Sequence, residues 1–278
     1  MKPDPFVTAI LISAGRPHHL HHTLEGLSRG TRIPDEVIVV NMDQPTERTS
    51  SPTLSTRHLD CRAPADHPLP LARARNLGAA EATPGHLLFL DVDCIPAADY
   101  VKTVTAQLAS TGGLIMGTPR YLRAPVGGHP TDADLERGSD PHELQPRPAT
   151  PTEKSDHYHL FWSLCFGIQS TDFTEIGGFD ASFVGYGGED TDFAYSARSR
   201  GVRFHRSQAT VFHQPHPSQS PPLQHFDSII INANRFRKKW GVWPMEGWLS
   251  EFRERGLIEW SERSPDPIQI RHLPPEPG

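Results

Sequence analysis

The sequence predicts an α/β fold in which a mixed, mainly parallel sheet is flanked by helices, and three local patterns lead to this prediction. Residues 6–12 form a short apolar run rich in β-branched side chains, which is typical of a buried strand. Leucines then recur after four and three residues, and Gly30 stands where a helix-capping glycine belongs. A second apolar run at residues 36–40 completes a β-α-β unit, whose two strands run parallel.

The same alternation of strands and helices continues along the chain. Residues 86–90 form a third apolar strand, and Pro84-Gly85 stops the helix that precedes it. Residues 121–156 are rich in proline, glycine and charge and show almost no periodicity, which predicts a long loop. The other expected elements are a short strand near 54–61, a helix at 71–82, ordered structure at 157–168, a helix from about Glu189, a strand at 201–212 and a helix at 223–240.

The composition argues against two classes of function. The chain has 27 basic and 33 acidic residues, a formal charge of −6 and no long basic block, so it lacks the electrostatic signature of a nucleic-acid-binding protein. Its three cysteines are odd in number and have no Cys-x-x-Cys spacing, which favours reduced cytoplasmic thiols over disulfides or a thiolate zinc site. No apolar run approaches the roughly 20 residues needed to cross a bilayer. We therefore expect a cytoplasmic protein without a transmembrane segment, whose membrane contact is at most peripheral.

Asp91-Val92-Asp93 directly follows the third apolar strand and is the candidate centre of a binding site. In a doubly wound α/β domain, ligands bind at the carboxyl ends of the strands. Two carboxylates at positions i and i+2 can both turn towards a cation, and Mg²⁺ and Mn²⁺ prefer such oxygen ligands. The alternative is a solvated turn in which an aspartate caps a helix near Pro96.

Several ordered motifs resemble known glycosyltransferases. Arg-Ala-Arg-Asn-Leu-Gly-Ala-Ala at 73–80, followed by Leu-Leu-Phe-Leu-Asp-Val-Asp at 87–93, resembles the family 2 glycosyltransferases. Gly-Gly-Phe-Asp at 177–180 and Gly-Tyr-Gly-Gly-Glu-Asp-Thr-Asp at 185–192 are similar to the Gly-Gly-Glu-Asp region of family 2 enzymes, β-1,4-galactosyltransferases and polypeptide N-acetylgalactosaminyltransferases. Val-Phe-His-Gln-Pro-His at 211–216 resembles the late histidine segment of the same families.

The resemblance implies a GT-A fold, the Rossmann-like fold of nucleotide-diphospho-sugar transferases. It implies a metal-dependent hexosyltransferase that moves a sugar from a nucleoside diphosphate, with UDP preferred, to a hydroxyl or similar acceptor on a glycan, peptide or small molecule. We expect one domain over residues 1–260. Within it, residues 1–120 would bind the nucleotide sugar, residues 157–260 the acceptor, and residues 121–156 would form a flexible insertion. Residues 261–278 read as a frayed Pro-rich tail.

The resemblance also assigns a divalent-metal site, for Mn²⁺ or Mg²⁺. Asp93 is the implied direct ligand, and Asp91 the implied ribose or metal partner. The third protein ligand is His213 or His216, of which we favour His213. The alternative for each histidine is an ordinary polar loop residue.

The acceptor half carries the implied catalytic groups. Asp190 is the expected general base of an inverting displacement, and Glu189 is expected to orient the acceptor or the helix beside it. The alternative is an acidic helix N-terminus that complements the helix dipole. Gly187 and Gly188 permit close approach to a sugar. Trp162, Phe166 and Tyr186 can stack on a sugar ring or belong to the core.

The donor's base and phosphate ends have their own candidates. In similar enzymes, residues after the first two strands meet uracil and ribose. Here these positions hold Ser13, Ala14, Gly15 and Arg16 after the first strand and Asp43 after the second. Asp43 can also be a plain turn residue. Arg75 can pair with the diphosphate or with Asp91, or lie on a helix surface.

Two other functions remain open at this point. A sugar-nucleotide nucleotidyltransferase would also use carboxylate-held Mg²⁺, but residues 13–17 make a poor phosphate loop. A non-catalytic carbohydrate- or nucleotide-binding protein could keep the fold. The sequence does not indicate the oligomeric state. Four histidines resemble a metal cluster in composition: His18, His19, His21 and His22. They sit in pairs without an evident carboxylate or cysteine partner, so we expect them to lie on a solvated helix face.

Overall fold

The computed structural model describes residues 4–43, 48–63, 67–217, 219–264 and 266–273. Its first six elements are those that the sequence predicts, with ends shifted by one or two residues. They are β1 (Val7–Ser13), α1 (Pro17–Ser28), β2 (Glu36–Asn41), β3 (Thr56–Asp60), α2 (Leu71–Glu81) and β4 (His86–Asp91).

The next elements include three that the sequence analysis did not anticipate: β5 (Cys94–Pro96), α3 (Tyr100–Thr111) and β6 (Leu114–Leu122). The strand β5 is too short to show a period, whereas α3 carries buried side chains three and four residues apart that were readable in the sequence. The expected elements then return with β9 (Cys165–Gln169), α6 (Glu189–Ser199) and β10 (Phe204–His213), while the short helix α5 (Ser170–Ile176) was not expected.

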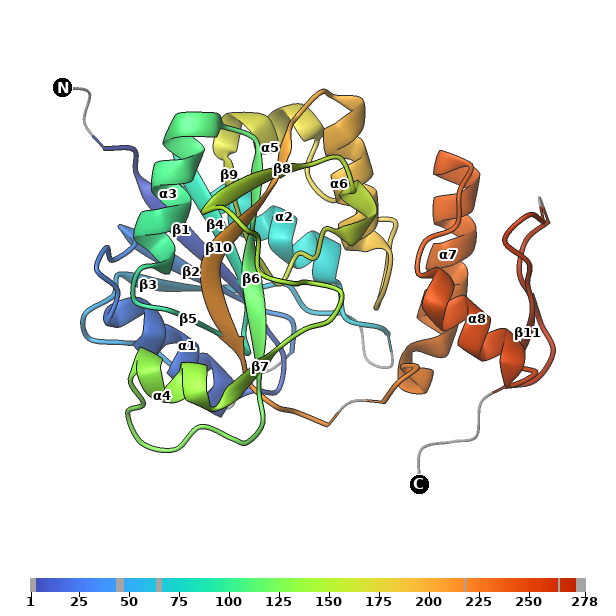
Figure 1. The fold of residues 1–278 in the computed structure, drawn as a ribbon, viewed down its shortest axis with the longest axis horizontal. Coiled ribbons are helices and arrows are strands. Elements are labelled where there is room, and N and C mark those ends of the chain that lie inside the picture. The colour runs from blue at the N-terminus through green and yellow to red at the C-terminus, as the bar shows by residue number, and fades with distance from the viewer. Residues whose placement is uncertain (1–3, 44–47, 64–66, 218, 265, 274–278) are drawn as a thin grey trace.

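These strands form one twisted sheet with helices on both faces (Figure 1). Its strand order is β3-β2-β1-β4-β9-β6-β10-β5. The pairs among β3, β2, β1 and β4 are parallel, while β9 runs antiparallel to both β4 and β6. The predicted α/β class, with a mixed sheet built on a parallel half, is confirmed.

The core lies on both faces of the sheet, because successive side chains of each strand point in opposite directions. On one face, Ala9 and Leu11 of β1 pack in the cluster that contains Leu24 of α1 and residues of α3. On the other face, Ile10 packs in the cluster of Phe89 with residues of α2, α5 and α6. The continuous apolar strands of the sequence are thus explained by burial on both faces.

Residues 121–156 contain more structure than the predicted loop. They hold α4 (Asp132–Arg137), β7 (Ser139–Pro141) and β8 (Thr152–Ser155). The strand β7 pairs with β6, and β8 pairs with β10. Pieces of three to six residues are too short for a detectable period, and their pairing partners lie far away in the sequence. The start of α4 was readable, because Thr131 and Asp134 form a capping box.

The C-terminal part forms a separate helical unit beside the sheet (Figure 1). After a single 3-10 turn (Leu223–His225) it contains α7 (Phe226–Trp240), α8 (Glu246–Glu254), β11 (Ile258–Glu259) and β12 (Gln269–Ile270). Its side chains build their own apolar cluster, which includes Phe226, Phe252 and Trp260. Within the predicted tail at 261–278, Gln269–Ile270 pairs with β11, while residues 265 and 274–278 lie outside the described part.

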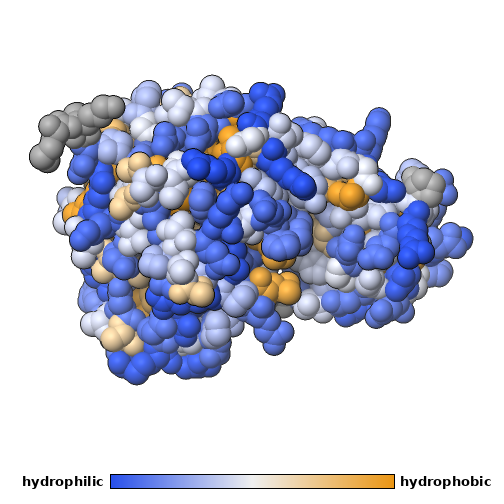
Figure 2. Space-filling view, turned by 45° about the horizontal axis from the view of Figure 1, so that its top comes forward, coloured by the Kyte–Doolittle hydropathy of each residue, from blue (hydrophilic) through white to orange (hydrophobic). Residues whose placement is uncertain are grey.

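The surface carries no single large apolar patch on the face shown in Figure 2, where hydrophobic residues occur in small separate groups. Within the described residues, no helix combines the length and the apolar composition that a membrane crossing requires.

Candidate active site

The turn after β4 is held from two sides. Thr23 of α1 donates a hydrogen bond from its hydroxyl to the carbonyl oxygen of Val92, at 2.8 Å. On the other side, β5 pairs antiparallel with β10, and His213 lies opposite Cys94 in this register. The backbone N–H of Gln214 donates to the carbonyl oxygen of Asp93, at 2.8 Å. Strand pairing therefore brings the end of β10 next to the second aspartate of the turn.

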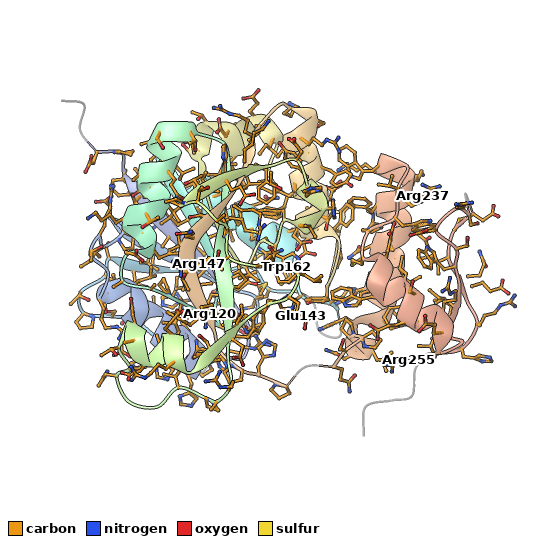
Figure 3. The ribbon with its side chains drawn as sticks, in the orientation of Figure 1. Arg120, Glu143, Arg147, Trp162, Arg237 and Arg255 are labelled. Carbon is orange, nitrogen blue, oxygen red and sulfur yellow. The ribbon has the colours of Figure 1, made fainter. Side chains whose placement is uncertain are left out.

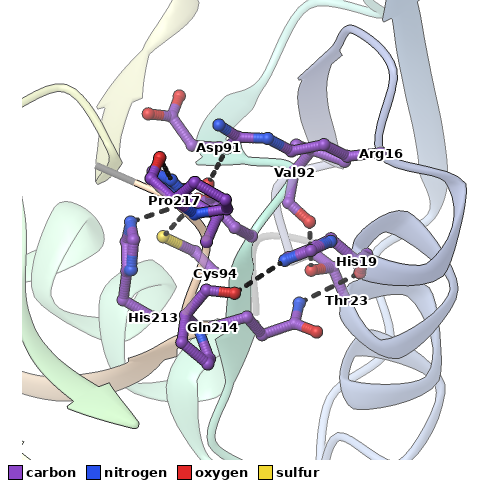
Figure 4. Close-up of polar contacts among 12 residues, drawn as sticks. Arg16, His19, Thr23, Asp91, Val92, Cys94, His213, Gln214 and Pro217 are labelled. Carbon is purple, nitrogen blue, oxygen red and sulfur yellow. Dashed lines mark hydrogen bonds and ion pairs between the residues drawn. The ribbon is translucent and has the colours of Figure 1, made fainter. Parts of the chain in front are cut away.

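Asp93, His213 and His216 form a group that fits one metal ion (Figure 4). Their ligand atoms all lie within 4.8 Å of one another. His213 Nε2 is 3.5 Å from one Asp93 oxygen, and His216 Nε2 is 3.4 Å from the other. Ligand atoms that share a cation at bonds of about 2.0–2.2 Å stand roughly 3–3.5 Å apart, so these distances are close to those of a ligand shell.

The protonation of His213 suits a metal ligand. Burial lowers the pKa of His213, and His216 and Arg16 lower it further, against the raising effect of Asp93. A neutral imidazole, the form that coordinates metal, is therefore favoured near pH 7. One buried carboxylate and two imidazoles can hold a divalent cation, and the two nitrogen ligands favour Mn²⁺ over Mg²⁺, which prefers an all-oxygen shell.

Arg16 also contacts the Asp93 carboxylate. Its guanidinium Nη1 hydrogen-bonds to Asp93 Oδ2, while about a third of the Arg16 side chain remains exposed. Arg16 precedes the first turn of α1, and His19, one turn further, hydrogen-bonds through its Nε2 with the carbonyl oxygen of Pro215 at 3.2 Å. Arg16 and His19, at and just before the first turn of α1, thus line the site on this side (Figure 4).

Asp91, the first aspartate, has a different partner. Its Oδ1 accepts a hydrogen bond from Arg75 Nη2 at 3.0 Å, and Arg75 Nη1 lies 3.4 Å from Glu189 Oε1. Arg75 is buried, with 3% of its surface exposed, so of the three alternatives for this residue the structure excludes the helix-surface one. The arginine joins the turn after β4 to the start of α6.

The two acidic residues that begin α6 both have raised pKa values. Burial and the charge of Asp190 raise the pKa of Glu189 to about 7, against the lowering effect of Arg75. Burial likewise raises the pKa of Asp190, against the lowering effects of Thr191 and Arg75. Glu189 is buried and ion-paired, whereas Asp190 is partly exposed.

The predicted donor-base residues meet at the ends of β1 and β2. The N–H of Met42 donates to the carbonyl oxygen of Ser13 at 2.9 Å, so the two strand ends lie side by side. Gly15 has a positive φ of 63°, and a Cβ built on it would lie 3.7 Å from Asp43 Oδ2. Ala14, between Ser13 and Gly15 in the sequence, is partly buried. These strand ends lie at the same carboxyl edge of the sheet as the turn after β4, because β1, β2 and β4 are parallel.

The Gly-Tyr-Gly-Gly loop before α6 is held by α7. Asn232, which is fully buried, donates hydrogen bonds to the carbonyl oxygens of Val184 and Gly187, at 3.1 and 2.9 Å. Gly187 and Gly188 have φ values of 94° and 86°, which favour glycine.

Tyr186, at the tip of this loop, is 39% exposed and stacks on two rings of the C-terminal unit. The ring centroid of His225 lies 4.6 Å from that of Tyr186, and the ring of Trp248 lies 5.7 Å away. Neither His225 nor Trp248 was predicted.

Trp162 and Phe166 have different environments. Trp162 is partly buried and lies between the sheet and the C-terminal helices in the view of Figure 3, with its ring edge-on to His142 at 4.8 Å. Phe166 is fully buried and stacks on Phe89 at 4.5 Å, so it belongs to the core and not to a sugar platform.

Comparison with known proteins finds matches to glycosyltransferases. Residues 148–217 match the sequence model of a family described as the N-terminal domain of galactosyltransferase. The matched range contains Glu189, Asp190 and both candidate metal-binding histidines. The validoxylamine A glucosyltransferases of Streptomyces hygroscopicus subsp. limoneus and subsp. jinggangensis (strain 5008) are each 26% identical over 259 residues, which cover 84% of this chain. The chain spans 57% and 61% of their lengths, less than two thirds in each case.

Solved structures decide the fold. Residues 1–349 of S. aureus TarS in complex with UDP-GlcNAc superpose with a TM-score of 0.59 at 13% identity, covering 84% of this chain and 64% of that one. GalNAc-T7 with UDP, GalNAc and Mn²⁺ gives a TM-score of 0.57 at 14% identity, covering 91% of this chain and 57% of that one. The chain has the GT-A glycosyltransferase fold.

Within this GT-A fold, several residues at the site escaped the sequence analysis. Tyr121, at the end of β6, stacks on His213 with centroids 4.6 Å apart, and His142 lies 5.2 Å from Tyr121. Both residues fall in the segment that the sequence predicts as a loop. Asn232 was readable only as a polar residue on a predicted amphipathic helix, and nothing local indicates which loop it holds.

Proposed function

We propose that this chain is a metal-dependent glycosyltransferase that uses a UDP-sugar and transfers its sugar, with inversion, to an acceptor hydroxyl. The observation that carries the proposal is the convergence of Asp93 with His213 and His216, from two distant parts of the sequence, at the carboxyl edge of a GT-A sheet. We also propose the predicted division of labour, in which residues 1–120 bind the nucleotide sugar and residues 157–260 the acceptor. The reactions and ligands named for the similar proteins support the donor class but belong to those proteins.

Asp93, His213 and His216 would hold the metal, and Mn²⁺ or Mg²⁺ would stabilise the negative charge that grows on the departing diphosphate. Asp91 is held by Arg75, 3.0 Å away, so we assign it a role beside the ion, towards the ribose, in preference to direct coordination. Arg16 carries the positive charge nearest to the metal group and would bind the diphosphate from the side of α1.

Asp190 is the proposed base that takes the proton of the acceptor hydroxyl. Asp190 Oδ1 accepts hydrogen bonds from the backbone N–H and the hydroxyl of Thr191, and within the described residues Oδ2 remains available for the acceptor. A raised pKa strengthens a carboxylate as a base, and partial exposure gives access. Glu189 is buried and ion-paired to Arg75, which supports a positioning role over proton transfer.

Calorimetric titration of UDP tests the donor and metal assignment. We expect UDP to bind in Mn²⁺ and to lose at least tenfold in affinity in EDTA. His213→Ala should abolish the Mn²⁺ dependence, whereas His18→Ala, an exposed histidine on α1, should leave it unchanged. UDP binding that is the same with and without metal would overturn the proposal.

A panel of UDP-sugars then identifies the donor. Release of UDP in the presence of Mn²⁺ marks the accepted sugar, and the anomeric configuration of the product tests inversion. A product that keeps the donor configuration would contradict the role of Asp190.

A further inference from the structure

A second group of candidate metal ligands lies on α1, away from Asp93. The ligand atoms of His21, His22 and Glu25 all lie within 4.8 Å of one another. Glu25 follows His21 by four residues and His22 by three, so all three side chains emerge on adjoining parts of one helix face. The expectation of a solvated face rests on these histidines having no carboxylate partner. Glu25, one turn away, is that partner.

A third histidine, outside this group, reaches Glu25 from a distant segment. His129 lies between β6 and α4, and its Nδ1 contacts Glu25 Oε1. The neighbouring carbonyl oxygen of Pro130 accepts a hydrogen bond from Arg29, the residue that caps α1. The segment before α4 therefore lies against α1 at this point, and Glu25 receives imidazoles from both sides.

The spacing between His22 and Glu25 is close to that of a ligand shell. His22 Nδ1 is buried and has no hydrogen-bond partner among the described residues, and it lies 3.7 Å from Glu25 Oε2. In a tetrahedral zinc site with bonds of about 2.0–2.1 Å, neighbouring ligand atoms stand roughly 3.4 Å apart. The gap is too wide for a hydrogen bond and is close to the separation that a shared cation sets.

The protonation states also suit coordination. Burial lowers the pKa of His22, which leaves a neutral imidazole near pH 7. Burial opposes ionisation of Glu25, but the contact with His129 and the charge of Arg29 outweigh it and lower the pKa of Glu25, which stays ionised. Neutral imidazole and ionised carboxylate are the forms that bind metal.

We propose that His21, His22 and Glu25 form a second metal site for a transition-metal ion such as Zn²⁺. His129, an exposed side chain that contacts Glu25, would turn to complete the site on binding and so fasten the segment before α4 to α1. Three imidazoles and one carboxylate favour Zn²⁺ over Mg²⁺ or Mn²⁺, which prefer oxygen-rich shells. The helix that would be fastened carries His19 and Thr23 and directly follows Arg16, and these residues contact the turn and the segment after β10 at the Asp93 site. The role is structural: an ion here would stiffen one wall of the donor site.

Zinc titration in a His213→Ala background isolates this site, because that substitution disables the Asp93 group. We expect the background protein to bind one Zn²⁺. Adding His21→Ala and His129→Ala should weaken binding at least tenfold, since two of four ligands are lost. Adding His18→Ala instead should change nothing, because His18 is exposed on α1 and lies outside the group. Circular dichroism checks that each variant is folded.

A second measurement detects the fastening itself. Trypsin can cut at Arg123 and Arg137, whose side chains are 54% and 71% exposed on either side of His129. We expect Zn²⁺ to slow these cuts in the wild-type protein and not in His129→Ala. Equal zinc affinity with and without His21 and His129, or an equal effect of His18→Ala, would overturn the proposal and indicate adventitious surface binding.

Discussion

Asp93 is the residue on which the contacts of the site converge. Its carboxylate is contacted by Arg16, His213 and His216, and its backbone is bonded to Gln214. A buried carboxylate that contacts one guanidinium and two imidazoles is stable without a bound ligand, because these positive and polar groups replace the water lost on burial. The same arrangement leaves a carboxylate and two imidazoles ready for a cation.

Asp190→Asn tests the base directly. We expect kcat to fall by about 10²–10⁴, the usual contribution of a general base, because the amide cannot accept the acceptor proton. Affinity for UDP in Mn²⁺ should stay within twofold, since Asp190 is not in the metal group. Steady-state rates and UDP titration measure the two effects. Asp227→Asn, an exposed aspartate on α7, is the matched control; near-normal turnover of Asp190→Asn would refute the assignment.

Glu189 makes stability depend on pH. Its pKa of about 7 in the folded protein lies above its ordinary value of 4.5, because burial and Asp190 disfavour the charge. Between these values the folded protein keeps a proton that the unfolded chain releases, so the contribution of Glu189 to the free energy of unfolding falls as pH rises. Between pH 5 and pH 8, the free energy of unfolding, measured with urea, should therefore fall less for Glu189→Gln than for the wild-type protein. Parallel pH profiles for the two proteins would contradict the raised pKa.

At the scale of elements, α7 shapes the acceptor side of the site. It holds the Gly-Tyr-Gly-Gly loop through Asn232 and begins directly after His225, which stacks on Tyr186. The loop residues Gly187 and Gly188 are themselves in left-handed conformations. A loop of this kind keeps one shape because a buried side chain bonds its carbonyl oxygens.

Asn232→Ala should loosen this loop. Two buried carbonyl oxygens lose their donor, which costs on the order of 1–3 kcal/mol in stability, and we expect KM for the acceptor to rise. Asn234→Ala is the matched control: Asn234, on the same helix, accepts a hydrogen bond from the N–H of Ile268, at 2.8 Å and far from the loop. Urea unfolding and acceptor kinetics separate the two effects. The loop role would fail if both variants showed the same KM.

At the scale of the whole molecule, the C-terminal unit is joined to the sheet body through α6. Asp192, which is fully buried, accepts hydrogen bonds from Trp240 Nε1 at 2.7 Å and from Lys239 Nζ at 2.9 Å. The unit has its own apolar cluster, so this polar junction helps to fix how the two parts sit.

Asp192→Ala should weaken this junction. Trp240 loses a buried partner, and we expect a loss of about 1–3 kcal/mol, smaller than for a fully buried ion pair because Lys239 is partly exposed. Hydrogen exchange should accelerate in α7 more than in β1 or β4. Asp180→Ala removes the outer, partly exposed pair with Lys239 and a hydrogen bond from the N–H of Ser182, but it leaves Asp192 and Trp240 paired and should affect α7 less. Uniform acceleration across the chain would indicate general destabilisation instead.

The sequence by itself determined the β-α-β half and the motifs. The predicted strands β1, β2 and β4 are present, and β4 ends at Asp91, because apolar runs and turn residues act locally. The start of α6 at Glu189 was readable in the same way. For the candidate residues, the sequence supplied identity and order along the chain.

Only the tertiary structure decided which residues meet. Antiparallel pairing of β5 with β10 sets His213 opposite Cys94, beside Asp93. Burial of α2 turns Arg75 inward to join Asp91 to Glu189, and the segment before α4 brings His129 to Glu25. The side-chain contacts of Arg75 and Glu25 among these span 16 to 114 residues of sequence. No local period encodes them, because strand register and helix packing are set by the whole core.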